Sequence, residues 1–174
     1  GYYFSLPASF NTITVALITT FMLRILVVAT PLLLVGLCLL GQWHVFAVAW
    51  LKAILLFFLA IQYFALLFLF LAYACPLDTL LGDIWPRFLS PMFALGCMYY
   101  PWRVANEVCP LVARFMFLNP AVYCSEGFKG ALLGGEGYLN TGICIAALFL
   151  VDIVLFYFFR RAIVRAINPV VGRE

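Results

Sequence analysis

Long apolar stretches without charge dominate the first half of the chain. Only Arg24 and Lys52 carry charge within the first 77 residues. The hydrocarbon core of a bilayer is about 30 Å thick, and a helix that crosses it needs about 20 predominantly apolar residues. The pattern therefore predicts transmembrane helices over about 12–40 and 45–74, and Pro76 ends the second because proline cannot continue a helix.

The second half mixes apolar and polar positions. A helix is predicted over about 79–100. It forms a third span if it begins near Thr79 and continues through Pro86, and otherwise the segment is re-entrant. Residues 101–138 are the most polar part of the chain, yet Phe and Leu occur throughout them. Their length and composition predict two short helices, separated at Asn119-Pro120, that lie in the membrane interface or dip into it.

A last apolar run at 139–159 predicts another transmembrane helix, interrupted by Asp152 and followed by a basic tail at 160–174. Lys and Arg beside a membrane span favour the cytoplasmic side, which predicts a cytoplasmic C-terminus. With about four spans, the aromatic interfacial segment 1–11 is then cytoplasmic and 101–138 is extracytoplasmic. We therefore expect an all-α polytopic protein of the plasma (inner) membrane.

The composition agrees with this fold class and excludes others. Hydrophobic residues make up 67% of the chain and charged residues 10%, with a mean hydropathy of +1.14. A soluble domain carries about a quarter charged residues, so no soluble catalytic domain is expected. The net charge of +3 is too small and too scattered to suggest a nucleic-acid partner.

The cysteines and the single histidine, His44, provide no predicted metal site. The six cysteines include no CxxC pair, so a zinc ligand set is missing. Cysteines within the apolar runs are most simply small packing residues. Cys109 and Cys124 flank the polar stretch and form a disulfide only if that stretch faces an oxidising compartment; otherwise they are free thiols.

Two charges in the predicted spans, Arg24 and Asp152, need an explanation. A charge in lipid costs about 2.5–3.5 kcal/mol on insertion scales, so such residues usually face protein or water. At 1.5 Å per residue the two lie at similar depths, which favours a structural Arg24–Asp152 ion pair. Two alternatives remain: Arg24 extends its side chain to the interface, or the charges line a pathway for an anionic or zwitterionic headgroup.

Aromatic side chains gather near the expected outer interface, among them Tyr99, Tyr100 and Phe117. Aromatic belts are the general pattern at membrane interfaces. The same rings could also stack against a sugar or lipid group that leaves the membrane. We include these three residues among the candidates for a substrate pathway.

Two stretches of the second half resemble a known family. One reads FALGCMYYPW (93–102), the other reads FLNPAVYCSEGFKGALLGG (117–135), and the last apolar helix follows. They resemble the permease subunits of type-2 ATP-binding-cassette exporters, and SLPAS at 5–9 looks like a sequence that such permeases place before a transmembrane helix. The matching positions of the re-entrant motif are Gly96, Tyr100, Pro101, Asn119, Pro120 and Glu126.

The resemblance implies a six-span permease domain of which this chain is a part, paired with a second permease copy or a homologous half. ATP and Mg would bind partner ATPase subunits, and this chain would bind no cofactor and supply no catalytic residue. It contains no GxxxxGK[ST] loop. The segment before Ser9 would couple to the ATPase, and 101–138 would form an extracytoplasmic re-entrant cap. Glu126 would bond exposed backbone there, or pair with Lys129 three residues away.

The predicted function is therefore that of the membrane subunit of an exporter. It would move an amphiphile, such as a lipid-linked glycan, a lipid or a hydrophobic drug, by alternating access. One alternative is a membrane scaffold without transport activity. Another is an enzyme acting on lipid at the interface, which would require convergent His, Asp or Cys residues at one membrane face.

Overall fold

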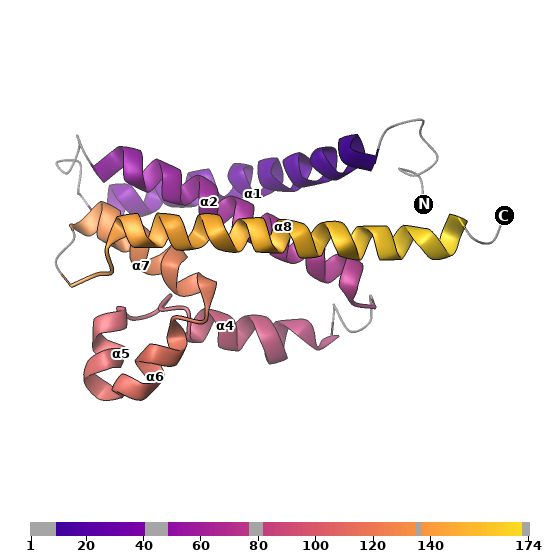
Figure 1. Cartoon of the computed structure of the whole chain (residues 1–174). Coiled ribbons are helices and arrows are strands. Elements are labelled where there is room, and N and C mark those ends of the chain that lie inside the picture. The colour runs from indigo at the N-terminus through magenta and orange to yellow at the C-terminus, as the bar shows by residue number, and fades with distance from the viewer. Residues whose placement is uncertain (1–9, 41–48, 77–81, 135–136, 172–174) are drawn as a thin grey trace.

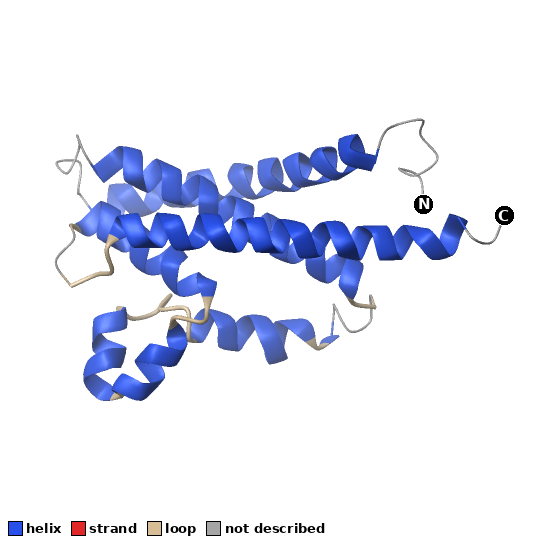
Figure 2. Ribbon diagram, viewed as in Figure 1, coloured by secondary structure: helices blue, strands red, loops and turns tan. Residues whose placement is uncertain are grey.

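The computed structural model describes residues 10–40, 49–76, 82–134 and 137–171, and all regular structure in these ranges is helical (Figure 2). In chain order (Figure 1), the helices are α1 (Phe10–Leu40), α2 (Ala49–Ala74), the π-helix η2 (Trp85–Leu89), α4 (Ser90–Ala94), α5 (Trp102–Val108), α6 (Pro110–Met116), α7 (Pro120–Leu133) and α8 (Thr141–Val171).

Three helices are long and apolar enough to cross a membrane: Asn11–Gly36, Trp50–Ala74 and Thr141–Arg165. They correspond to the first, second and last predicted spans, and they confirm an all-α integral membrane protein. The second helix ends before Pro76, as expected from the proline. The last one runs to Val171, beyond its predicted end at residue 159, because Ile163 continues its buried face one turn after Phe159.

The predicted span over 79–100 differs from the structure, which describes this segment from residue 82 onwards. η2 and α4 together cover ten residues, and at 1.5 Å per residue they extend about 15 Å, half the thickness of the hydrocarbon core. Prolines in the first turn of each helix remove backbone donors, so the regular ladder of an α-helix is interrupted. The stretch ends at Cys97, whose φ of 57° belongs to the left-handed region.

The predicted re-entrant segment contains three short helices where two were expected. The additional break lies at Cys109, which is extended (φ −149°, ψ 92°) because the residue before a proline is driven out of the helical region. Pro110 then begins α6, and Asn119-Pro120 separates α6 from α7 as predicted. The chain returns from the end of α2 to the start of α8 through α4 and later α7, and not through a fourth continuous span (Figure 1).

The two ends of the bundle differ in charge. Helix α1 begins, and α2 and α8 end, at one end of the molecule, which we call the basic end because it carries Arg160, Arg161 and Arg165 (Figure 1). We call the opposite end, with Leu40 and Thr141, the loop end. The positive charges agree with a cytoplasmic basic end under the positive-inside rule, and this orientation stays a prediction.

The core lies where α2, α7 and α8 pack on one another. Its buried residues include Leu56, Tyr63 and Leu67 of α2, with Cys144 and Leu148 of α8. Without a hydrophobic driving force in lipid, such a core depends on close van der Waals packing and on small residues at the contacts.

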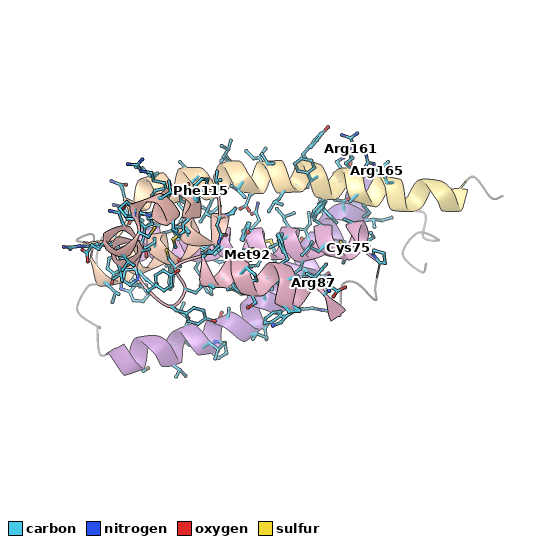
Figure 3. The ribbon with its side chains drawn as sticks, turned by 90° about the horizontal axis from the view of Figure 1, so that it is seen from below. Cys75, Arg87, Met92, Phe115, Arg161 and Arg165 are labelled. Atoms are coloured by element: carbon cyan, nitrogen blue, oxygen red, sulfur yellow. The ribbon has the colours of Figure 1, made fainter. Side chains whose placement is uncertain are left out.

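Helix α1 is less covered than the other two spans. Near its start, Leu17, Ile18 and Phe21 pack against a buried cluster that includes Leu66 and Phe159. The most apolar 18-residue window of α1 contains no buried residue. Figure 3 shows α1 leaving the bundle towards its C-terminal end. Most of this helix is therefore left for lipid or another chain to cover.

Gly127 of α7 marks the closest helix contact in the core. A methyl group added there would lie 2.7 Å from Cys144 Cβ and 3.2 Å from a methyl carbon of Leu56. We expect Gly127→Ala to lower the free energy of unfolding by about 1–3 kcal/mol, because α7 must move away from α8. Gly36→Ala is the matched control, since nothing lies within 4 Å of that position. Equal thermal stability of the two variants in detergent would contradict this account of the contact.

Candidate functional site

Residues of the predicted re-entrant motif meet where the end of α4 contacts the start of α7. A methyl group at Gly96 would lie 2.7 Å from Ala121 Cβ, so only glycine allows this approach. The side chain of Asn119 accepts a hydrogen bond from Ala121 N (3.1 Å), which caps α7, and donates another to Met92 O (2.6 Å). One amide thus fixes the start of α7 against α4.

Glu126 joins α7 to the start of α5. Its side chain is fully buried, and Oε1 accepts a hydrogen bond from Trp102 N at 3.0 Å. Pro101 precedes Trp102 as the N-cap of α5 and supplies no side-chain acceptor, so Glu126 satisfies a backbone donor that would otherwise lack a partner. This is the backbone-bonding role that the resemblance implied. Burial raises the pKa of Glu126, against the opposing effects of the Trp102 hydrogen bond and the Lys129 charge.

Two further side chains of α7 bond the carbonyls at the end of α4. Ser125 Oγ donates to Gly96 O and Lys129 Nζ donates to Cys97 O. Lys129 therefore contacts backbone and forms no ion pair with Glu126, which rules out the alternative of a simple surface pair. These bonds help to hold Cys97 in its left-handed conformation. Burial raises the pKa of the Cys97 thiol to about 12.

The aromatic residues divide into an ordered group and an exposed one. The ring of Phe117 lies 5.1 Å from Trp102 and 6.3 Å from Tyr123, measured between centroids. The hydroxyl of Tyr100 donates to Ala94 O at 2.9 Å. Tyr99 is 81% exposed. Of the three predicted pathway aromatics, Tyr100 and Phe117 therefore stabilise the re-entrant segment, and Tyr99 alone projects away from it.

An apolar cavity of about 480 Å³ lies beside this segment. Arg87, Met92 and Phe115 follow one another along this side of the molecule (Figure 3). The cavity combines a large apolar wall with few polar groups, which is typical of a site for a hydrophobic or amphiphilic molecule. Its lining comprises Tyr63, Leu67, Arg87, Phe88, Pro91, Met92, Leu95, Phe115, Leu118, Asn119, Pro120, Val151 and Leu155.

Asp152 is buried on α8, directly after Val151, which lines this cavity. Its side chain is 1% exposed, and neither carboxyl oxygen has a hydrogen-bond partner. It lies within electrostatic range of the Tyr63 hydroxyl and the Cys124 thiol. An unsatisfied buried polar group lowers the stability of the folded state by about 1–3 kcal/mol, so Asp152 destabilises the fold.

The structure does not bring Arg24 and Asp152 together. Arg24 is exposed on α1 and pairs with no carboxylate among the residues described. Similar depth in the membrane did not imply contact, because depth says nothing about which side of a helix a residue occupies. Arg24 is left on the uncovered surface of α1, near the middle of a span.

Cys109 and Cys124 do not form the disulfide considered from the sequence. Both are free thiols; Cys109 is exposed, whereas Cys124 is buried in the core. The break before α6 directs the first outward, and the packing of α7 on α8 encloses the second.

Thiol labelling distinguishes these two environments. With single-cysteine variants in membranes, we expect maleimide to modify Cys109 faster than Cys124 by on the order of a hundredfold, because burial excludes the reagent and raises the pKa of Cys124. Denaturation in detergent should equalise the two rates. Wild-type protein in which neither residue reacts until a reductant is added would contradict the free-thiol assignment.

Among the described residues, no group of three or more His, Cys, Asp and Glu side chains could hold a metal ion. The buried carboxyl groups of Glu126 and Asp152 lie in separate places, one at a backbone amide and the other in the α2–α8 core. The cavity and the surrounding hydrogen bonds define a shaped apolar site.

Sequence reasoning missed Tyr63 and Met92, which line the cavity and contact each other through the Tyr63 hydroxyl and the Met92 sulfur at 3.6 Å. Both lie in apolar runs where nothing distinguishes them from packing residues. A tyrosine in the middle of a span was the one available signal, because its hydroxyl requires a partner when buried.

No family model, no curated protein and no solved structure matches this chain.

Proposed function

We propose that this chain is the membrane-spanning subunit of an ATP-driven exporter of the ATP-binding-cassette class, and that it moves an amphiphilic molecule. The observation that carries the proposal is the junction at the re-entrant segment. Three positions that match the family motif link these helices: Gly96 lies against α7, Asn119 joins α7 to α4, and Glu126 joins α7 to α5. The other two, Pro101 and Pro120, stand at the starts of α5 and α7.

The shape of the molecule supports the same proposal. A re-entrant segment beside a membrane cavity would cover one end of a pathway, and irregular backbone at membrane depth is tolerated where protein or a cavity surrounds it. The apolar cavity beside this segment suits the lipid-like part of a substrate. Substrates in this proposal are amphiphiles: lipids, lipid-linked glycans or hydrophobic drugs.

The uncovered α1 supports a second permease copy or a homologous half as partner. Arg24 is exposed within the span Asn11–Gly36. An arginine in a span usually faces protein or water, since lipid cannot solvate it. A partner helix or a water-filled pathway at this surface would provide that environment. The ATPase, with ATP and Mg, would be a further partner, and the basic end would then be cytoplasmic.

A transport measurement tests the proposal. Inside-out vesicles containing the protein with its native partners should accumulate a fluorescent phospholipid analogue only when ATP is present. Met92→Trp should reduce this accumulation, because the indole fills the cavity. Ile143→Trp should leave it unchanged, because Ile143 is exposed on α8 and does not line the cavity. Accumulation without ATP, or equal rates for the wild type and Met92→Trp, would contradict the proposed site.

A further inference from the structure

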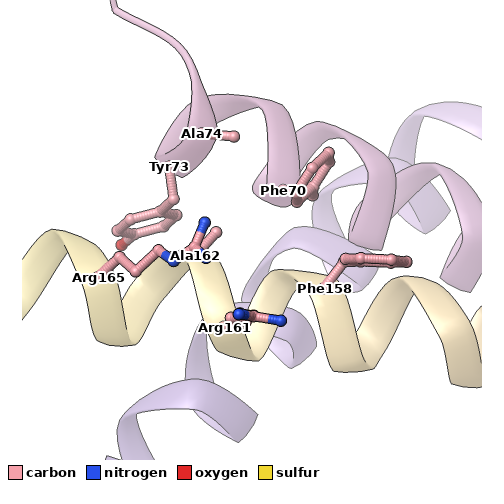
Figure 4. A pocket seen from close by; sticks show the side chains of 7 residues that line it. All are labelled: Phe70, Tyr73, Ala74, Phe158, Arg161, Ala162 and Arg165. Carbon is pink, nitrogen blue, oxygen red and sulfur yellow. The ribbon is translucent and has the colours of Figure 1, made fainter.

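A second cavity, of about 500 Å³, opens between the ends of α2 and α8 at the basic end. Tyr73 and Ala74 of α2 line it together with Arg161, Ala162 and Arg165 of α8. Figure 4 shows both arginines projecting from α8 beside the last turns of α2. This cavity lies in a different part of the molecule from the one at the re-entrant segment and shares no residue with it.

The two arginines have no ion-pair partner among the described residues. Arg161 and Arg165 are four residues apart and so occupy one face of α8, where like charges repel. Neither forms an ion pair with a carboxylate in the part of the chain that the structure describes. A bound anion would relieve this repulsion, and the guanidinium group matches a phosphate oxygen pair in geometry.

The cavity changes from basic to apolar along the helix axes. Towards the membrane interior its wall consists of Phe70 and Phe158, whose ring centroids lie 6.4 Å apart. Towards the basic end it consists of Tyr73, Arg161 and Arg165 (Figure 4). An amphiphile with an anionic head and an apolar tail has this same polarity. The remaining lining residues, Ala74 and Ala162, are small and take up little of the cavity.

We propose that this cavity binds the phosphate headgroup of an anionic phospholipid from the adjacent leaflet, with the start of its acyl chain against Phe70 and Phe158. Basic pockets between transmembrane helices are suited to such headgroups. The site needs no ATPase partner, and it holds for this chain whether or not the protein transports.

Binding to purified full-length protein in a neutral detergent tests the site. Short-chain phosphatidylglycerol is titrated calorimetrically and compared with phosphatidylcholine of the same chain length and with glycerol 3-phosphate. We expect saturable binding of phosphatidylglycerol. Arg161→Gln and Arg165→Gln should each weaken it about tenfold, the effect of losing a charge-assisted hydrogen bond.

Arg160→Gln is the matched control, because it removes the same charge from the same helix but does not line the cavity. It contacts Asn11 instead, at 3.4 Å. Ala162→Leu fills the cavity without changing charge and should also weaken binding, which keeps the test valid if an arginine variant fails to fold.

The outcomes separate a lipid site from general electrostatic attraction and from a free-phosphate site. The lipid site is supported if phosphatidylglycerol binding weakens in Arg161→Gln, Arg165→Gln and Ala162→Leu and changes little in Arg160→Gln. If Arg160→Gln weakened phosphatidylglycerol binding as much as the other two variants, the binding would be general surface attraction. If Arg161→Gln and Arg165→Gln left the binding unchanged, the cavity would not be the site. Either result overturns the proposal. Glycerol 3-phosphate binding as tightly as the lipid would show a free-phosphate site and overturn the assignment to lipid.

Discussion

Glu126→Ala is expected to cost about 2–4 kcal/mol of folding free energy, whereas Glu126→Gln is expected to cost less than about 1 kcal/mol. Alanine removes the acceptor for Trp102 N and leaves a buried void in α7. Glutamine keeps the shape and the carbonyl oxygen, so the link between α7 and α5 persists. Unfolding in denaturing detergent, followed by circular dichroism, measures both changes.

The neighbouring Ser125→Ala is a milder control, because it removes one hydrogen bond from the same junction without emptying a large volume. If Glu126→Ala and Ser125→Ala had the same small effect, Glu126 would not be the main link to α5. A large loss in Glu126→Gln would mean that the carboxylate charge, rather than the acceptor, is required.

The pH dependence of Glu126 has a definite sign. Burial raises its pKa above the ordinary value of 4.5, so the folded state favours the protonated carboxyl. Its contribution to stability is complete below the ordinary pKa and is lost as the pH rises through the raised value. The wild type should therefore lose stability relative to Glu126→Gln as the pH rises above about 4.5. A stability difference between the two proteins that does not change with pH, or in which the wild type gains stability as the pH rises, would contradict the raised pKa.

Asp152→Leu is expected to increase the free energy of unfolding by about 1–3 kcal/mol and to abolish ATP-dependent export. Leucine has the same branched skeleton as aspartate, and neither carboxyl oxygen has a hydrogen-bond partner to lose. A buried ionisable side chain that destabilises a transmembrane helix is a candidate for a functional role, and Asp152 is such a residue. Thermal unfolding and the vesicle assay provide the two measurements.

Leu148→Asn is the reciprocal control for Asp152. Leu148 is fully buried one turn earlier on α8, so a polar side chain there should lower stability. A loss of stability in Asp152→Leu would mean that the carboxyl makes a favourable contact in the folded protein. Increased stability with normal export would mean that Asp152 has no part in transport.

The long helices could be predicted because lipid imposes a simple rule on the sequence: a span must be long and apolar. The separation of two helices at Asn119-Pro120 could be predicted as well, since proline is common in the first turn of a helix and rare in its interior. The segment around 79–100 could not, because its two prolines are compatible with either a kinked span or a short helix. The structure shows a short helix that ends at Ala94, followed by a turn in which Cys97 is left-handed.

Contacts between residues far apart in the sequence were the main feature of the structure that could not be predicted. Glu126 was expected to bond backbone, but its partner, Trp102 N, lies at the start of another helix, 24 residues away in the sequence. The expected Arg24–Asp152 pair failed for the same reason. Depth along a helix follows from residue number, whereas the direction of a side chain depends on how the helices pack.

The central claim is that this chain works with an ATP-binding-cassette ATPase, and gentle purification of the full-length protein from its native membrane tests it most directly. Mass spectrometry of the purified complex should identify a stoichiometric subunit, or a fused domain, that carries a GxxxxGK[ST] loop. Its ATP hydrolysis should fall when Glu126→Ala disrupts the re-entrant junction. A purified protein without any such ATPase would contradict the exporter account and favour a membrane scaffold.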